Sequence, residues 1–116
     1  MDCADLGMLY LNRDTNERGI AHGGVAIFFK KSRMELKKFK MNNPERYEVL
    51  PAVGRMAGLK RKLVVIACYL PLNYPVPRGK AALTFISDCV TQAKRKYDDP
   101  LIIVTCLLYT SPSPRD

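Results

Sequence analysis

The residues best suited to chemistry in this chain lie at Cys68–Asn73 (CYLPLN), directly after an apolar run. Tyr69 offers a hydroxyl and Asn73 an amide, and both groups can bind a phosphate oxygen. A strand that ends at a proline places its last side chains at the rim of a sheet, where α/β proteins often bind ligands. The alternative is structural, with Tyr69 packed beneath the loop and Asn73 forming a turn.

The other candidate ligands have plainer interpretations. Glu48 lies between Tyr47 and Val49 on an expected strand, and strand alternation predicts a solvent-facing side chain on an edge strand rather than a metal ligand. His22, the only histidine, precedes a glycine pair and is interpreted as a loop residue. Three aspartates on or just after an expected helix are interpreted as surface charges: Asp88, Asp98 and Asp99.

The cysteines indicate a reduced, intracellular protein of the nucleus or cytoplasm. Cys3, Cys68, Cys89 and Cys106 are far apart in the chain, form no CxxC pair, and include two that sit in apolar runs. This pattern favours buried thiols over a disulfide framework or a zinc site. No signal peptide and no apolar run of about 18 residues is visible, so we expect no membrane partner.

The charge balance favours a polyanionic partner. The chain has 19 Lys and Arg against 11 Asp and Glu, which gives a formal charge of +8. Nucleic acid is the first candidate and an acidic membrane surface the second, while a solvated basic surface explains the charge equally well. Lys30–Lys40 and Arg55–Lys62 are the basic stretches, and they are either phosphate-contacting surface or solvated loops. No interleaved aromatic residues mark a base-stacking platform.

Five strands and one helix are expected. The strands are Leu6–Leu11, Gly24–Phe29, Tyr47–Val53, Lys62–Leu70 and Leu101–Thr105. The helix spans about Arg78 to Lys96, where apolar residues recur at three- and four-residue spacing, and Pro71–Pro77 is expected to be irregular. Two antiparallel hairpins followed by a β-α-β crossover predict an α/β protein of the α+β sandwich type, with a mixed sheet and one covering helix. Lys30–Lys40 lacks a periodicity that would assign it to either type.

The order of these segments resembles the endonuclease/exonuclease/phosphatase family. It runs GGVAIFF, a Glu-containing strand, VVIACYLPLN, an amphipathic helix and DPLIIV, and it is most similar to the endonuclease domains of non-LTR retrotransposons. The resemblance covers about Gly23 to Thr105. It implies that residues 1–105 are part of a four-layer α/β/β/α domain.

The resemblance implies Mg²⁺-assisted hydrolysis of a phosphodiester, with DNA as the expected substrate. Tyr69 matches the family's phosphate-contacting tyrosine, and Asn73 matches its asparagine less securely because Leu72 is an extra residue. Arg78 opens the helix in a region that faces nucleic acid in the family's nucleases. Lys30, Lys31 and Arg61, from the two basic stretches, complete the expected nucleic-acid-binding set.

Most of the family's catalytic equipment has no counterpart in this sequence. The metal-binding Glu has no match upstream, and Cys106 stands where a Gly-Asp-Phe-Asn motif should begin. We therefore expect no metal ligands, weak Mg²⁺ binding and no activity from this fragment of a retrotransposon-type endonuclease. Cys106–Asp116 (CLLYTSPSPRD) resembles a translated sequencing adapter, with a natural Ser/Pro-rich tail as the alternative. A basic, non-catalytic nucleic-acid-binding module and a chain without function remain open.

Overall fold

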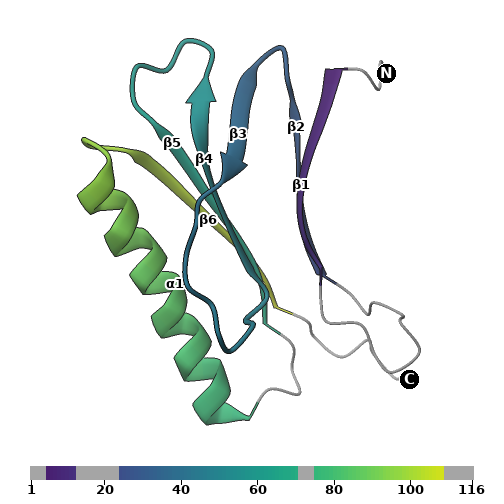
Figure 1. Ribbon diagram of the computed structural model, residues 1–116, viewed down its shortest axis with the longest axis vertical. Coiled ribbons are helices and arrows are strands. Elements are labelled where there is room, and N and C mark those ends of the chain that lie inside the picture. Colours follow the sequence, from purple (N-terminus) through teal and green to yellow (C-terminus); the bar gives the residue numbers. More distant parts are fainter. Residues whose placement is uncertain (1–4, 13–23, 71–74, 109–116) are drawn as a thin grey trace.

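The computed structural model describes residues 5–12, 24–70 and 75–108. It contains six strands and one helix (Figure 1). The strands are β1 (Leu6–Asn12), β2 (Gly24–Lys30), β3 (Met34–Lys38), β4 (Val49–Met56), β5 (Leu63–Leu70) and β6 (Leu101–Leu108), and the helix is α1 (Val76–Lys96). The expected α/β class is confirmed. Asn73, His22, Cys3 and residues 109–116 lie outside the described ranges.

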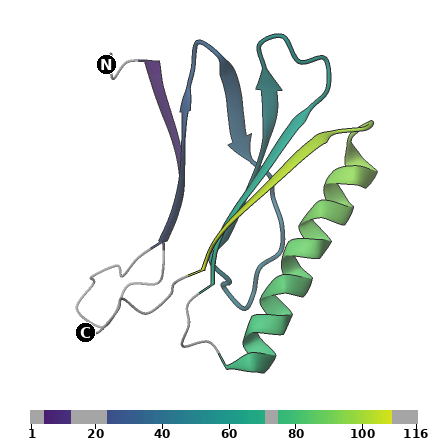
Figure 2. The ribbon, with the colours of Figure 1, turned by 180° about the vertical axis from the view of Figure 1, so that it is seen from behind.

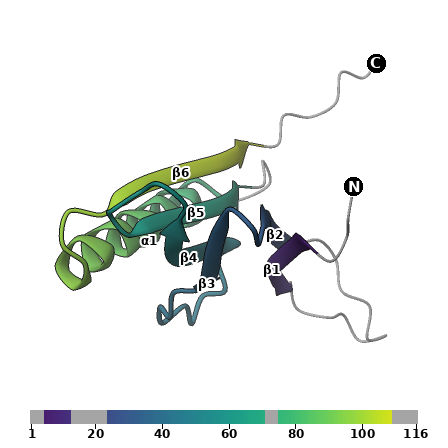
Figure 3. The ribbon, with the colours of Figure 1, turned by 90° about the horizontal axis from the view of Figure 1, so that it is seen from above.

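The strands form two sheets that stack as separate layers. β1 and β2 pair as an antiparallel hairpin, and the larger sheet has the order β3-β4-β5-β6. Within the larger sheet only β5 and β6 are parallel, and α1 connects them. The helix covers one face of the four-stranded sheet and the β1–β2 hairpin lies against the other, as Figures 1, 2 and 3 show from three sides. The result is three layers, in the order helix, sheet, hairpin.

The core on the helix side follows the alternation of β5. Val64, Ile66 and Cys68 point toward α1 and belong to one buried cluster. The helix contributes its small and branched residues to that cluster: Ala82, Ile86, Cys89 and Ala93. Their three- and four-residue spacing is the periodicity that predicted the helix from sequence. Other buried residues alternate with the cluster along β4 and β5, and lie on the hairpin side: Leu50, Ala52, Leu63 and Ala67.

The helix begins earlier than the sequence indicates. Val76 and Pro77 are helical, and Pro75 is the residue that caps α1. The expectation that all of Pro71–Pro77 is irregular is therefore wrong for the last two residues. The backbone N–H groups in the first turn of a helix have no acceptor within the helix, so a proline, which lacks an N–H, is tolerated there.

The sixth strand, β3, occupies a stretch that the sequence left unassigned. Its burial alternates, with Met34 and Leu36 turned inward between exposed neighbours. β4 supplies the pairing partner, with Leu36 opposite Gly54. The strand's charged residues hide this alternation in the sequence, and it becomes regular only against β4.

Glu48 contradicts its expected place in the fold. Its side chain is 4% exposed, and it directly precedes β4, which pairs on one side with β3 and on the other with β5. The prediction of a solvent-facing residue on an edge strand is wrong because both faces of this sheet are covered. Tyr47 and Val49 belong to the helix-side cluster, which leaves Glu48 on the hairpin side.

Across the described ranges, no helix combines the length and the apolar character that crossing a membrane requires.

Candidate functional site

A pocket of about 420 Å³ opens where β5 and β6 end. β5 contributes Ala67–Tyr69, β6 contributes Thr105 and Cys106, and β2 contributes Val25 and Ala26 from the hairpin layer. Parallel neighbours present their carboxyl ends at the same edge of a sheet, which is the usual place for ligands in α/β proteins. The pocket therefore depends on both sheets, and its volume suits a small ligand or part of a larger one.

Tyr69 reaches this pocket because β4 continues to pair with β5 at the rim of the sheet. The Tyr69 N–H donates to the Glu48 carbonyl oxygen at 2.9 Å, one residue beyond the Val49–Cys68 pair. Alternation then turns the Tyr69 side chain away from α1 and toward the hairpin. It is half-buried, so the phenol is held by packing while part of it meets solvent. The same pairing puts the buried Glu48 beside Tyr69.

The thiol of Cys68 is a poor candidate for chemistry in this pocket. It donates a hydrogen bond to the Thr105 carbonyl oxygen at 3.3 Å. Burial, with smaller contributions from the neighbouring Cys106, raises the pKa of Cys68 to about 12. Burial likewise raises the pKa of Cys89, in the helix-side core, to about 11. Both thiols are protonated near neutral pH, and the thiolate is the form that attacks or binds metal. The hydroxyl of Tyr69 is the better polar group of the pocket.

Thiol labelling tests this burial. Cys68 and Cys89 are expected to react with iodoacetamide only when the chain unfolds, whereas the exposed Cys106 reacts in the folded state. Raised folded-state pKa values also mean that the unfolded chain releases these protons first, so stability falls as the pH rises above 9. Peptide mass spectrometry after timed labelling would measure each site. Labelling of folded Cys68 at the rate of Cys106 would contradict the placement.

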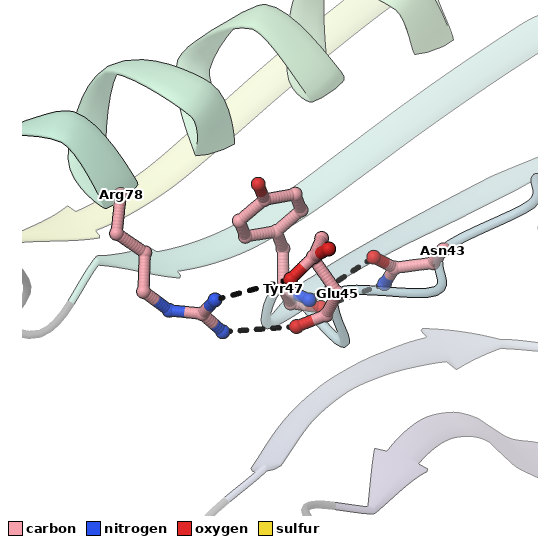
Figure 4. Close-up of polar contacts among 4 residues, drawn as sticks. All are labelled: Asn43, Glu45, Tyr47 and Arg78. Atoms are coloured by element: carbon pink, nitrogen blue, oxygen red, sulfur yellow. Dashed lines mark hydrogen bonds and ion pairs between the residues drawn. The ribbon is translucent and has the colours of Figure 1, made fainter.

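Arg78 is engaged with its own chain (Figure 4). Its Nη2 donates to the Glu45 carbonyl oxygen at 2.9 Å, and its Nη1 lies 4.0 Å from the Glu45 carboxylate. The guanidinium carbon is 5.0 Å from the centre of the Tyr47 ring. Asn43 closes the same loop by donating to the Tyr47 carbonyl oxygen at 2.9 Å and accepting the Tyr47 N–H at 3.0 Å. Arg78 thus joins the start of α1 to the loop before β4.

Arg61 lies at the opposite end of β5 from Tyr69. It precedes the strand, and the rise of about 3.3 Å per residue separates the two residues by roughly 25 Å. Its Nε donates to the Asp99 carbonyl oxygen at 2.8 Å, and its Nη2 lies 3.5 Å from the Asp99 carboxylate. These contacts tie the β4–β5 connection to the chain that enters β6.

Lys30 and Lys31 also lie far from Tyr69. Val25, near the start of β2, lines the Tyr69 pocket, whereas Lys30 ends that strand. The Lys31 N–H donates to the Asp5 carbonyl oxygen at 2.7 Å, beside the start of β1. Of the residues expected to bind nucleic acid, Arg78 lies at the same end of the molecule as Tyr69, near the end of β5. Lys30, Lys31 and Arg61 are at the other end.

The two basic stretches meet at that other end, around a groove of about 240 Å³. Lys31 and Arg33 come from the β2–β3 turn, and Arg55 comes from β4, opposite Glu35 of β3. Sequence reasoning named the two stretches but did not join them, because β3 was unassigned. The apolar run of β5 and its antiparallel pairing with β4 were the sequence signals available for placing Arg55, which lies near the end of β4.

Asp5 holds this turn in place. Its carboxylate accepts the Ser32 N–H and the Ser32 hydroxyl, both at 2.7 Å. The two hydrogen bonds, helped by the charges of Lys30 and Lys31, hold the pKa of Asp5 below its usual value. The contact orders the turn that carries Lys31 and Arg33.

The described residues form no metal centre. No group of three or more His, Cys, Asp and Glu side chains that could hold a metal ion occurs within these ranges. Mg²⁺ needs one or two carboxylates together with phosphate and water oxygens, and Glu48 is the buried carboxylate beside Tyr69. Within the described ranges, Glu48 belongs to no group of three or more candidate ligands. Comparisons of the chain with protein-family models, curated proteins and solved structures found no match.

Proposed function

We propose that this chain is part of a nucleic-acid phosphodiesterase domain of the endonuclease/exonuclease/phosphatase type, in which Tyr69 contacts a phosphate. The observation that carries the proposal is the position of Tyr69, in a pocket at the carboxyl ends of the parallel pair β5 and β6. A phenol held there can donate a hydrogen bond to a phosphoryl oxygen, and such a bond strengthens as negative charge develops. The formal charge of +8 favours a polyanionic substrate.

The chemistry assigned to the described residues is limited to binding and orientation. The Tyr69 hydroxyl would donate a hydrogen bond to the phosphate, whereas Glu48, beside Tyr69 in the strand pairing, does not line the pocket and is assigned no role. In the family a bound Mg²⁺ polarises the phosphoryl oxygen. The described side chains do not fit that ion, so no step of this proposal passes through it.

A tyrosine-to-phenylalanine exchange tests the role of Tyr69. Tyr69→Phe is expected to weaken binding of a fluorescent duplex about three- to tenfold, the effect of losing one hydrogen bond to a charged oxygen. Tyr97→Phe, which removes a hydroxyl at the C-terminal end of α1, is the matched control and should bind as the parent chain does. The 116-residue chain itself is expected to leave the duplex uncut in Mg²⁺.

Fluorescence anisotropy would measure the binding, and denaturing gels would measure cleavage. Equal affinity of the Tyr69→Phe variant and the parent chain would refute the phosphate contact. Cleavage by the parent chain that Tyr69→Phe abolishes would instead show that the chain carries a working active site.

A non-catalytic nucleic-acid-binding module is the second candidate, and the groove of Lys31, Arg33 and Arg55 favours it. Removing one cation that neutralises a phosphate of the duplex lowers the salt slope of binding by about 0.9. This function predicts that Arg33→Gln and Arg55→Gln reduce the slope while Tyr69→Phe changes nothing. The phosphodiesterase proposal predicts weaker binding with Tyr69→Phe.

A further inference from the structure

The outer face of the β1–β2 hairpin is apolar and aromatic. Met8 pairs with Phe28, and Tyr10 pairs with Ala26, so these four residues share one face of the hairpin, and all four are exposed. The side chains of Met8, Tyr10 and Phe28 are 51%, 48% and 61% exposed. Their neighbours on the inner face, Leu9 and Ile27 among them, are half-buried. Two aromatic rings therefore lie on a solvent-facing sheet surface.

The register makes the two rings neighbours. Tyr10 is two residues beyond Met8, so it lies diagonally across the hairpin from Phe28. Diagonal neighbours on one face of an antiparallel pair are about 7–8 Å apart. Two rings at this spacing offer stacking positions for two successive bases. The sequence alone did not indicate that these two rings are neighbours, because Tyr10 and Phe28 are far apart along the chain.

Cations lie at both ends of this aromatic face. The Lys38 ammonium, from β3, is 5.4 Å from the centre of the Tyr10 ring. Lys30 shares the outer face with Phe28, two residues further along β2. Beyond Lys30, the chain enters the turn whose Lys31 and Arg33 line the basic groove with Arg55.

Among the described residues of this region, two are acidic. Glu35 lines the groove and Asp5 is bonded to Ser32, so the described cations outnumber the described carboxylates. The groove and the neighbouring Lys30 are thus basic, and they border the apolar face of the hairpin. A polyanion with exposed ring systems matches both properties.

We infer that the outer face of the β1–β2 hairpin binds single-stranded nucleic acid, with bases stacked on Phe28 and Tyr10. Phosphates would lie against Lys30, Lys38 and the groove cations. The inference rests on the proposed function in that both require a nucleic-acid partner. A duplex hides the faces of its bases, whereas unpaired bases stack freely on aromatic side chains. This surface adjoins the Tyr69 pocket at Ala26, but Phe28 and Tyr10 are not among the residues that line the pocket.

Ring removal is the direct test. Phe28→Leu and Tyr10→Leu keep an apolar side chain but remove the stacking face. Each is expected to weaken binding of an oligothymidylate of about 15 nucleotides roughly tenfold. Phe28→Tyr keeps a ring and should bind as the parent chain does, and Met8→Leu on the same face is the control without a ring. A 2-aminopurine base in the oligonucleotide would report stacking by its quenched fluorescence, and the quenching should diminish in the two ring variants.

A charge variant that keeps both rings supplies a second measurement. Lys38→Gln should lower the salt slope for the single strand by about 0.7, and Lys94→Gln on the helix should leave it unchanged. Far-UV circular dichroism would establish that each variant is folded. If Phe28→Leu does not fold, Tyr10→Leu and Lys38→Gln still test the inference.

Three results would overturn the inference. Phe28→Leu could bind the oligonucleotide as tightly as the parent chain, or the duplex could bind as tightly as the single strand. Light scattering could also reveal a dimer that Phe28→Leu dissociates, so that a second copy covers the face. If Tyr69→Phe weakens duplex binding and Phe28→Leu leaves single-strand binding unchanged, this inference alone is wrong. If Phe28→Leu weakens single-strand binding and Tyr69→Phe leaves duplex binding unchanged, the inference is supported and the Tyr69 proposal is wrong.

Discussion

Replacing Gly54 with alanine is expected to lower the free energy of unfolding by about 3 kcal/mol. Gly54 lies in β4 opposite Leu36 of β3, and an added Cβ would collide with the Glu35 backbone carbonyl. A flexible side chain could turn aside, but a carbonyl in a paired strand cannot, so β3 would have to move. Urea unfolding monitored by circular dichroism would measure the change.

Gly79→Ala is the matched control for this exchange. Gly79 lies in α1, and the space where its Cβ would stand is open. Alanine there is expected to stabilise the chain by about 0.5–1 kcal/mol, since glycine loses more backbone entropy when a helix forms. Two identical substitutions should thus act in opposite directions. Equal destabilisation at both positions would show that the collision at Gly54 is not the cause.

Ile66→Ala is expected to cost about 3–4 kcal/mol. Ile66 is fully buried in the middle of β5, in the cluster that joins the sheet to α1. Removing its outer carbons leaves a cavity whose walls are held by the sheet on one side and the helix on the other. The unfolding midpoint in urea should fall with little change in slope, because the fold itself is kept.

Ile103→Ala is the control for the cavity. Ile103 lies on β6, opposite Val65 of β5, and its side chain is 42% exposed. The same substitution there removes less buried surface and leaves no enclosed cavity, so a destabilisation below about 1 kcal/mol is expected. A destabilisation at Ile103 equal to that at Ile66 would mean that β6 packs against something that the described residues do not include.

Local patterns predicted most of the elements. The apolar run of β5 and the helical spacing of α1 identify themselves, because each pattern matches the geometry of a single element. β3 was not predicted because its apolar residues, Met34 and Leu36, are only partly buried and lie among charged residues. Its strand character depends on pairing with β4. Glu48 was misplaced for a related reason, since the sequence does not say that a second sheet covers that face.

The candidate site divides in the same way. The proline after Leu70 was enough to place Tyr69 at the rim of a sheet, and the structure puts it there. The pocket around it is a tertiary feature, because Val25 and Thr105 reach it from strands in different sheets or distant in the chain. The residues around Arg61 and Lys30 do not indicate that both lie at the opposite end of the strands from Tyr69. That distance is set by the lengths of β5 and β2.

The sequence by itself determined the class of the fold, the buried strand β5, the helix face and the basic character of the chain. These depend on residue type and on periods of two or 3.6 residues, which are local properties. Tertiary structure alone decided that Tyr10 and Phe28 form one surface, that Arg33 and Arg55 share a groove, and that Glu48 is buried. Strand register and the stacking of layers set those distances, and both arise from contacts between segments far apart in the chain.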